Sequence, residues 1–274
     1  AGNYTRYNVS INVDGTAQTP SSEAEVIDLI GCFLCDDGTI WLNKWKKNMP
    51  SNVVGIIYSP IGEGDLAGSD IADKDFNYYA LAVNEVKGFG FDKTAEGAFD
   101  FPAGVFQVTS DDSGIDNISS IQDMSGYQST QALIEAPIGT SIKGALERWS
   151  KPENMESSGW FIPSAGQYWK LTNLVENGTS GATWASTSGG RYGFTSDNAV
   201  SEKLKELTSY CVNADDPIIG ANHTYWTLTR RADGAMYSFG YQCNEDGDRF
   251  FIGGVSVADN KGSGSRYIRP IIAF

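Results

Sequence analysis

Apolar residues occur along the chain in continuous runs and in alternation, and both patterns predict short β-strands. The continuous runs at 53–58 and 78–83 are typical of strands buried on both faces, in the middle of a sheet. Alternating segments follow towards the C-terminus, separated by Asp-Gly pairs that favour tight hairpin turns. The strands expected in this C-terminal meander are 225–229, 236–242, 249–257 and 266–274.

The stretch 159–171 passes from a strand pattern to a helix pattern within a few residues. Pro163 disfavours helical backbone at the residue before it. Ser164 and Gln167 then have the spacing of a capping box, which predicts a helix that begins at Ser164. The apolar residues that follow at helical spacing are Tyr168, Leu171, Leu174 and Val175. We expect this amphipathic helix to pack its apolar face against the core.

Helical periodicity is also found in three other segments. Two short helices are expected at 127–135 and 141–149, separated by Pro137, Ile138 and Gly139. A third helix is predicted by the spacing of four apolar residues, which are Val200, Leu204, Leu207 and Cys211, with Asn198 as its N-cap. Helices and strands together predict the α+β class.

The first residues form a separate pattern. Val9, Ile11 and Val13 alternate with polar residues, as in a half-buried strand, and 16–24 has the composition of a loose connector. The strand is interpreted either as the tail of a preceding domain or as a partner of the main sheet, and we favour the tail. The expected organisation is therefore an N-terminal strand and linker at 1–25 and one module at 26–274.

Charge excludes two classes of partner. The 274 residues include 34 acidic and 20 basic side chains, for a net charge of −14. Binding to nucleic acid needs a basic surface, and binding to anionic membranes needs clustered Lys and Arg. No apolar run approaches the length of about 20 residues that spans a bilayer. We therefore expect neither nucleic-acid binding nor a membrane span.

The four cysteines do not predict a disulfide framework. Cys32 and Cys35 form a C-x-x-C pattern, but in an extended segment positions i and i+3 point to opposite faces, which disfavours a redox or zinc site. Cys211 and Cys243 are either paired or free, and free buried thiols are favoured. The acidic stretch 111–117 lacks the ligand order of an EF-hand, so it is interpreted as a solvated loop. No metal or cofactor is predicted.

A candidate ligand site lies in a polar segment that follows the capped helix. Residues 177–198 are rich in Gly, Ser and Thr, and four large side chains interrupt them: Trp184, Arg191, Tyr192 and Phe194. Large side chains on a flexible polar loop are typical of saccharide sites, so these four are the candidate ligand-binding residues. The alternative is that they fold back onto the core.

Three motifs together resemble a known group of bacterial surface domains. The motifs are Gly159-Trp160-Phe161-Ile162-Pro163-Ser164-Ala165-Gly166, Tyr225-Trp226-Thr227-Leu228-Thr229 and Arg266-Tyr267-Ile268-Arg269-Pro270-Ile271-Ile272-Ala273-Phe274. In this order they resemble C-terminal domains related to the Fibrobacter succinogenes major paralogous domain and the Legionella collagen-like adhesin. Such domains occur in Bacteroidetes outer-surface and fimbria-associated proteins. The resemblance runs from about residue 26 to residue 274.

The resemblance implies a C-type-lectin-like fold, in which helices pack against a twisted antiparallel sheet with long loops. It also implies a module of an extracellular adhesin on the bacterial surface. The calcium-dependent sugar motifs of true C-type lectins are not present: Lys151-Pro152-Glu153-Asn154 has the wrong order, and Trp184 is followed by Ala185. The active cysteine pair of the formylglycine-generating enzymes, which share this broad fold, has no match either.

Three hypotheses about function follow. The first is a non-catalytic surface module that binds a glycan or a host or bacterial surface protein, as the distal domain of a fimbrial protein. The second is a structural pilus subunit that pairs with other fimbrial subunits through the strand at 8–13. The third is a hydrolase, which the sequence disfavours because the single histidine, His223, lies in no nucleophile motif. No catalytic residue is assigned, and the pair Asp246 and Asp248 is interpreted as a hairpin turn.

Overall fold

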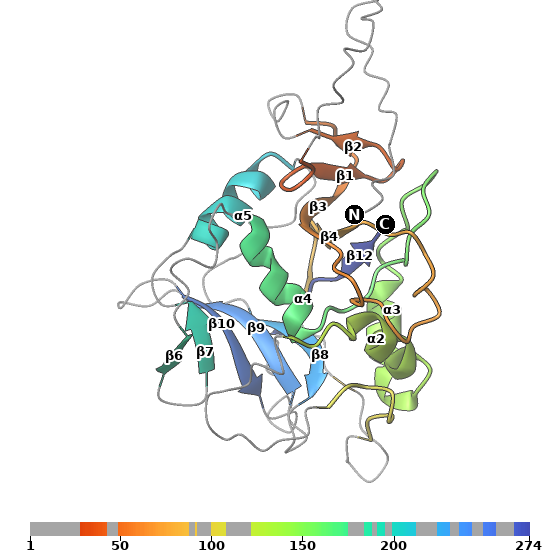
Figure 1. Cartoon of the computed structure of the whole chain (residues 1–274), viewed down its shortest axis with the longest axis vertical. Helices are drawn as coiled ribbons and strands as arrows, with labels where there is room; N and C mark the ends of the chain where they lie inside the picture. The colour runs from red at the N-terminus through yellow and green to blue at the C-terminus, as the bar shows by residue number, and fades with distance from the viewer. Residues whose placement is uncertain are drawn as a thin grey trace, which may run out of the picture.

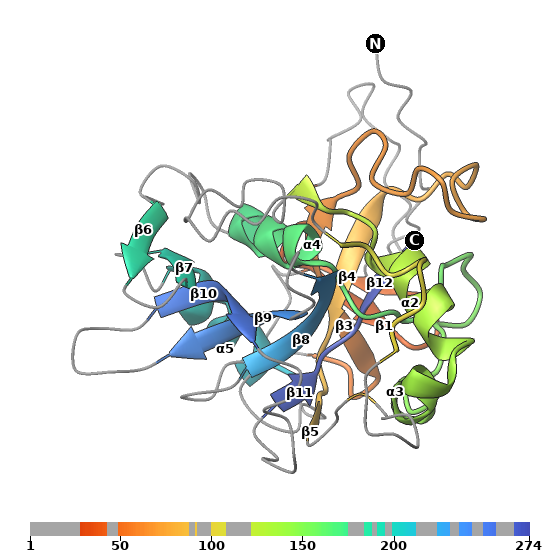
Figure 2. The same ribbon diagram turned by 90° about the horizontal axis from the view of Figure 1, so that it is seen from below.

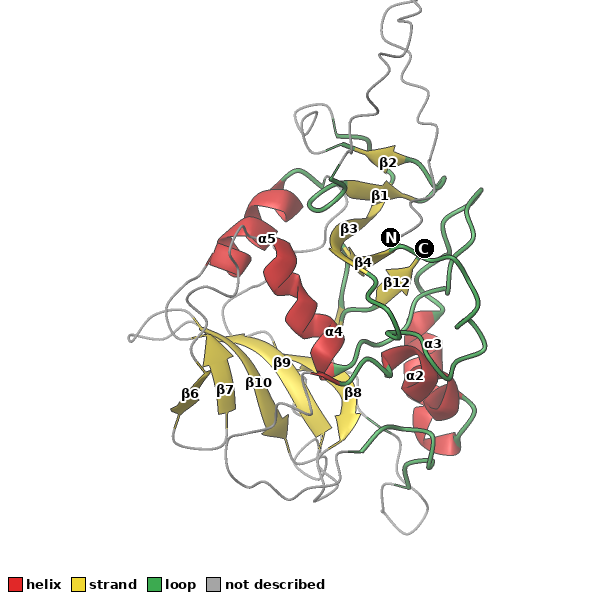
Figure 3. Cartoon of the chain, in the orientation of Figure 1, coloured by secondary structure: helices red, strands yellow, loops and turns green. Residues whose placement is uncertain are grey.

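The computed structural model describes residues 28–42, 49–87, 91, 100–107, 122–174, 184–187, 191–194, 199–211, 224–230, 236–242, 249–255 and 266–274. These residues form two β-sheets and several short helices (Figure 1). Neighbouring strands are antiparallel with one exception, and helices pack between and beside the sheets (Figure 3). The predicted α+β class is confirmed.

The first sheet contains the two strands that were expected to be central. Its order is β12-β4-β3-β1-β2, and every neighbouring pair is antiparallel. The continuous apolar runs form β3 and β4, each of which has a neighbour on both sides, so the expected central position is confirmed. The strands are β1 (Phe33–Cys35), β2 (Ile40–Trp41), β3 (Val53–Pro60), β4 (Tyr78–Ala82) and β12 (Ile271–Ala273).

The second sheet contains the C-terminal meander. Its order is β5-β11-β8-β9-β10-β7-β6, and only the β11–β8 pair within it is parallel. The strands are β5 (Val86–Lys87), β6 (Trp184–Thr187), β7 (Arg191–Phe194), β8 (Thr224–Arg230), β9 (Met236–Gln242), β10 (Arg249–Val255) and β11 (Arg266–Ile268). The predicted strands at 225–229, 236–242 and 249–257 therefore correspond closely to β8, β9 and β10.

The last predicted strand is in fact two strands in different sheets. Residues 266–268 form β11 beside β8, and residues 271–273 form β12 beside β4. Pro270 separates them, because proline has no N–H to donate to a strand ladder and so breaks the pairing pattern. Its carbonyl accepts a hydrogen bond from Ala82 N (3.0 Å). The prediction of a single strand at 266–274 is wrong, and the chain instead connects the two sheets at this point.

The helices occur where the periodicity placed them, with shifted ends. The two expected helices at 127–135 and 141–149 are α2 (Gly126–Ile134) and α3 (Thr140–Leu146), joined by the 3-10 turn η2 (Pro137–Gly139). The capped helix is α4 (Ala165–Trp169), which continues as the 3-10 helix η3 (Lys170–Leu174), so it is shorter than expected. The helix α5 (Ala199–Ser209) completes the set. Figure 2 shows α2 and α3 at the opposite end of the molecule from β6 and β7.

The first sheet divides the core, and side chains at and next to β1 enter two different core clusters. Phe33 and Cys35 enter the cluster that contains α4, η3 and α5, whereas Cys32 and Leu34 enter the cluster around Trp160. The expected separation of the two cysteines onto opposite faces is confirmed. Burial, reinforced by two nearby aspartates, raises the pKa of the Cys35 thiol to about 12.

The apolar face of α5 also agrees with its prediction. Val200, Leu204, Leu207 and Cys211 are all buried in the same cluster as α4. Cys211 is a free thiol, and burial raises its pKa to about 12, which makes it unreactive at neutral pH. Within the described part of the chain, no helix has the length and apolar character that crossing a membrane requires.

Candidate functional site

Three distant stretches of the chain meet at the N-terminus of α4. Ser164 and Gln167 form the predicted capping box: Gln167 N donates to Ser164 Oγ (3.2 Å), and Ser164 N donates to Gln167 Oε1 (2.9 Å). Ser164 Oγ in turn donates to the carbonyl of Asp123. Thr229 Oγ1, on β8, accepts from Ala165 N (2.9 Å). The start of α4 is thus tied to the turn before α2 and to the second sheet.

Asp123 is the buried acid of this junction. Its Oδ1 accepts from Ser125 N (2.8 Å) and Ser125 Oγ (2.6 Å), and its Oδ2 accepts from Thr229 Oγ1. The side chain is buried, and burial raises the pKa of the carboxyl above its ordinary value, although the donated hydrogen bonds act in the opposite direction. Three donors therefore hold one carboxyl group in a fixed orientation.

A second buried acid lies on the loop after β3. Asp65 Oδ2 forms an ion pair with Lys170 Nζ (2.6 Å) and accepts from Gly62 N (2.8 Å). The same Lys170 Nζ lies 5.8 Å from the centre of the Tyr79 ring. Both partners of the ion pair are largely buried, so this contact fixes the loop against η3.

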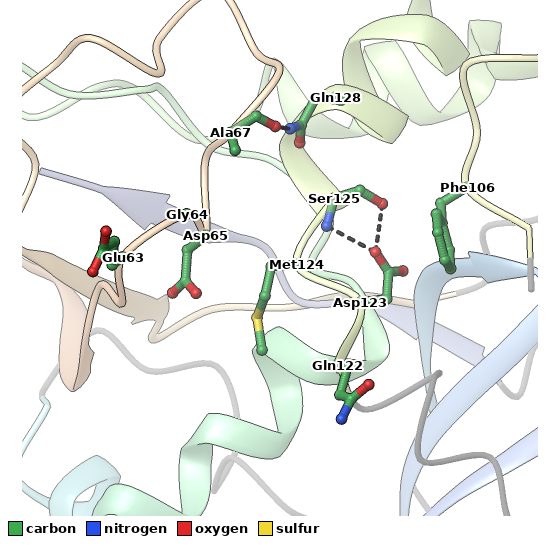
Figure 4. A pocket seen from close by; sticks show the side chains of 10 residues that line it. All are labelled: Glu63, Gly64, Asp65, Ala67, Phe106, Gln122, Asp123, Met124, Ser125 and Gln128. Atoms are coloured by element: carbon green, nitrogen blue, oxygen red, sulfur yellow. Dashed lines mark hydrogen bonds between the residues drawn. The ribbon is translucent and has the colours of Figure 1, made fainter.

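The two acids lie on the walls of an open pocket of about 550 Å³ (Figure 4). This volume is within the range of small-ligand sites in proteins. One wall is the loop after β3, and the other is the turn that precedes α2. The lining residues are Glu63, Gly64, Asp65, Ala67, Phe106, Gln122, Asp123, Met124, Ser125 and Gln128.

Phe106 gives the pocket an exposed aromatic ring on a fixed backbone. Among the described residues, it is the exposed large apolar residue, with 37% of its surface accessible to solvent. Its backbone N donates to Ser129 Oγ (3.1 Å), and its carbonyl accepts from Arg230 N (3.0 Å). An exposed ring on a rigid support is an arrangement that binding sites use, because the ring does not have to be ordered when a ligand arrives.

Gln128 connects the two walls. Its Nε2 donates to the carbonyl of Ala67 (2.7 Å), which fastens the loop after β3 to the first turn of α2. Its Oε1 is shielded from solvent and has no partner among the described residues. An unpaired buried acceptor costs about 1–3 kcal/mol. A ligand or water molecule that donates a hydrogen bond to this Oε1 would therefore remove that cost.

Most of the residues that line the pocket are polar. It offers carboxylate and amide groups beside one aromatic ring, and these residues include neither histidine nor cysteine. Ser125 Oγ donates to Asp123 Oδ1, and the other oxygen of this carboxyl group accepts from Thr229. In the described parts of the chain, no three His, Cys, Asp or Glu side chains lie close enough together to hold a metal ion.

The candidate residues predicted from the sequence lie elsewhere. Residues 177–198 were expected to form a flexible loop, but the structure places Trp184 in β6 and the other three in β7, in a hairpin at the edge of the second sheet. Trp184 pairs with Phe194, Tyr192 with Ser186, and Arg191 with Thr187. The loop prediction is therefore wrong for 184–187 and 191–194. None of the four lines the pocket, and their role as ligand-binding residues stays a prediction.

Several other predictions fall outside the described residues. They concern the strand at 8–13, the acidic loop at 111–117, His223, Cys243, the turn with Asp246 and Asp248, the N-cap Asn198, and Val175. The pocket residues, in contrast, were missed because they occur in weakly patterned sequence. The one local signal is the short Asp123-Met124-Ser125 segment directly before a helix, where an acid commonly accepts hydrogen bonds from the next turn.

Comparison with known proteins supports the fold. No protein-family model matches the chain, and no curated protein matches it. The structure is similar to the crystal structure of a fimbrial protein from Bacteroides ovatus ATCC 8483, with a TM-score of 0.54 and 14% sequence identity. The likeness covers 89% of this chain and 48% of that protein, so this chain spans about half of its length. At this identity the likeness shows a shared fold.

Proposed function

We propose that this chain is a non-catalytic module of a fimbria-type protein on the bacterial cell surface, where it binds a glycan or a surface protein. The observation that carries the proposal is the fold shared with a fimbrial protein over 89% of the chain. The proposed fold family is the C-type-lectin-like one, with residues 26–274 as one module. Contacts with other fimbrial subunits and an extracellular location belong to the same proposal.

The positions of the three resemblance motifs support this fold assignment. Phe161 and Ile271 exchange two backbone hydrogen bonds of 2.9 Å each, which joins the first motif to the last. Leu228 N donates to the carbonyl of Pro163 (3.0 Å), which joins the second motif to the first. Residues that pack together across such long sequence separations determine a fold, so their joint presence argues for a common architecture.

The pocket supports the binding role. An exposed aromatic ring beside carboxylate and amide groups suits a sugar, because the ring packs against the apolar face of the sugar while the polar groups pair with its hydroxyls. Phe106 supplies the ring, and Glu63 and Gln122 supply exposed polar groups. The β6–β7 hairpin, with Trp184, is the second place where a glycan contact is proposed.

Cellular location tests the main proposal. Antibodies raised against the purified chain should label the outer surface of intact cells that produce the protein, in immunogold electron microscopy. A strain that lacks the gene is the control for specificity. Gold particles confined to the cytoplasm of sectioned cells would refute a surface module.

A glycan array tests the ligand class. The purified chain should bind a subset of neutral glycans, with and without calcium, and Phe106→Ala should weaken this binding. Trp184→Ala reports on the hairpin instead, so the two variants separate the two proposed contact sites. If the folded protein binds no glycan on the array, a protein ligand is favoured.

A hydrolase is the competing hypothesis, and the three acids that line the pocket, Glu63, Asp65 and Asp123, make it testable. Chromogenic glycosides should remain intact when they are incubated with the purified chain. Turnover that disappears in Asp123→Asn but survives in a variant outside the pocket would overturn the non-catalytic proposal.

A further inference from the structure

A second pocket, of about 450 Å³, lies on another part of the molecule and has a different lining. It is formed by the residues around the β1–β2 turn, the segment before β4, the loop at 154–156 and Phe274. Most of its wall is apolar, and several of the apolar side chains are only half-buried. The apolar lining residues are Leu29, Ile40, Phe76, Tyr78, Met155 and Phe274.

The walls of this pocket are joined by backbone hydrogen bonds. The carbonyl of Phe274 accepts from Asn77 N (2.7 Å) and Tyr78 N (3.0 Å), and Phe274 N donates to the carbonyl of Tyr78 (3.1 Å). On the other side, Glu153 N donates to the carbonyl of Asp36 (2.6 Å). The cavity is therefore preformed, and a ligand would bind without first ordering its walls.

The close approach of the β1–β2 turn to the loop at 153–155 depends on a glycine. Gly38 has a φ of +84°, and a Cβ atom at this position would lie 2.3 Å from the carbonyl oxygen of Glu153. Asn154, which follows Glu153 in the chain, also has a positive φ, of 53°, and its Nδ2 donates to the carbonyl of Asp37 (3.3 Å). Two residues in the left-handed region thus shape one edge of the pocket.

The rim of the pocket is acidic. Asp75 and Glu156 are both exposed lining residues, and Glu156 Oε1 contacts Lys74 Nζ at 2.6 Å. Exposed ion pairs of this kind are weak, so an incoming cation can replace Lys74. The net charge of −14 also attracts a cationic partner from a distance.

From this geometry we infer that the second pocket binds an arginine side chain of a partner polypeptide. The aliphatic part of arginine fits the apolar wall, and its planar guanidinium stacks on aromatic rings and pairs with carboxylates. A purely apolar side chain would make no use of the carboxylates on the rim. An anionic ligand would be repelled by it. Lysine fits the charge but not the planar stacking.

The test uses the purified chain and small model compounds as probes. Binding of Nα-acetyl-arginine N-methylamide is measured by ligand-observed NMR, beside the corresponding lysine, citrulline and leucine compounds. Citrulline has nearly the shape of arginine but no charge. We expect a dissociation constant on the order of millimolar for the arginine compound, and about tenfold weaker binding of citrulline. Added salt should weaken arginine binding.

Variants locate the site. Glu156→Gln should weaken arginine binding about three- to tenfold and leave leucine unaffected, whereas Phe76→Ala should weaken every compound. Phe106→Ala, in the first pocket, is the matched control and should change nothing. Thermal unfolding checks that each variant is folded. If Phe76→Ala does not fold, Glu156→Gln still provides the test.

Two outcomes overturn the inference. Equal binding of arginine and citrulline would show a pocket that selects for shape alone. Absence of arginine binding, or binding that neither pocket variant changes, would show that the pocket is not an arginine site. The inference rests on the proposed binding module for its biological sense. Its test is independent of the cellular location, so either proposal can fail while the other stands.

Discussion

The hydroxyl of Tyr168 donates a 2.7 Å hydrogen bond to the carbonyl of Arg269, at the residue where the chain leaves β11 for β12. Both residues are almost fully buried. This bond connects α4, the helix that begins at the capping box, to the link between the two sheets.

Tyr168→Phe should therefore destabilise the fold without changing its shape. The variant keeps the ring but leaves a buried carbonyl without its donor, which costs about 1–3 kcal/mol. Urea denaturation would measure the loss. The matched control is Tyr127→Phe, because the Tyr127 hydroxyl interacts with Asp70, which is exposed, and its loss should matter less. Equal losses in the two variants would contradict this explanation.

The Arg269 side chain makes several charged contacts in the core. Its guanidinium donates to the carbonyls of Ala82 (2.8 Å) and Val83 (2.5 Å) and pairs with Glu85 Oε2 (3.2 Å), which also accepts from the Tyr225 hydroxyl (2.6 Å). Arg269→Met should cost about 3–5 kcal/mol, because it leaves a buried carboxylate without its cation.

A second substitution separates the charge from the other contacts of Arg269. In the double variant Arg269→Met/Glu85→Gln, no uncompensated carboxylate remains, so part of the stability should return. The rest of the loss belongs to the carbonyls of Ala82 and Val83. Denaturant titrations of the single and double variants give the coupling free energy. A double variant no more stable than Arg269→Met would argue against a charge effect.

Burial of Asp123 predicts a specific pH dependence of stability. Its pKa in the folded protein is raised above 3.8, so the folded state holds this proton more tightly than the unfolded state does. The contribution of Asp123 to the free energy of unfolding is therefore most favourable below pH 3.8. It declines as the pH rises through the raised pKa and is constant above it.

Asp123→Asn should remove this component. The difference in unfolding free energy between the wild type and the variant, measured by denaturation at a series of pH values, should fall as the pH rises from 3.8 and then level off. A difference that rises with pH in this range would mean that hydrogen bonding to the carboxylate outweighs burial.

Two glycines give a matched pair of alanine substitutions. At Gly126, the first residue of α2, a Cβ atom would lie 2.2 Å from Gln167 Oε1 and 2.5 Å from Ser164 N. At Gly144, inside α3, a Cβ atom would have no neighbour within 4 Å. Gly126→Ala should destabilise the protein by about 1–3 kcal/mol, because the capping box must move. Gly144→Ala should stabilise it by about 0.5–1 kcal/mol. Calorimetric melting temperatures would check both signs.

Local signals predicted much of the fold. The capping box at Ser164 and Gln167 involves residues three positions apart, so its chemistry is visible in the sequence. The burial of Leu204 and Leu207 follows equally well from helical spacing. These predictions succeeded because each depends on neighbours along one element.

Long-range pairing decided the features that were missed. The hairpin of β6 and β7 depends on pairing with β10, which supplies a partner for a segment whose Gly and Ser content predicts a loop. The pocket at Asp123 depends on Thr229, more than 100 positions away in sequence. The division of the terminal segment into β11 and β12 depends on two partners, β8 and β4, in different sheets.

The position of β11 and β12 in the chain has a consequence for biosynthesis. They follow every other described element, yet β11 pairs with β8 and β12 with β4. During translation, the edges of β8 and β4 therefore stay unpaired until residues 266–273 have left the ribosome. Until then, the nascent protein presents two unpaired strand edges, which can pair with other chains and aggregate. A chaperone that covers these edges would protect the protein at this stage better than one that binds the folded protein.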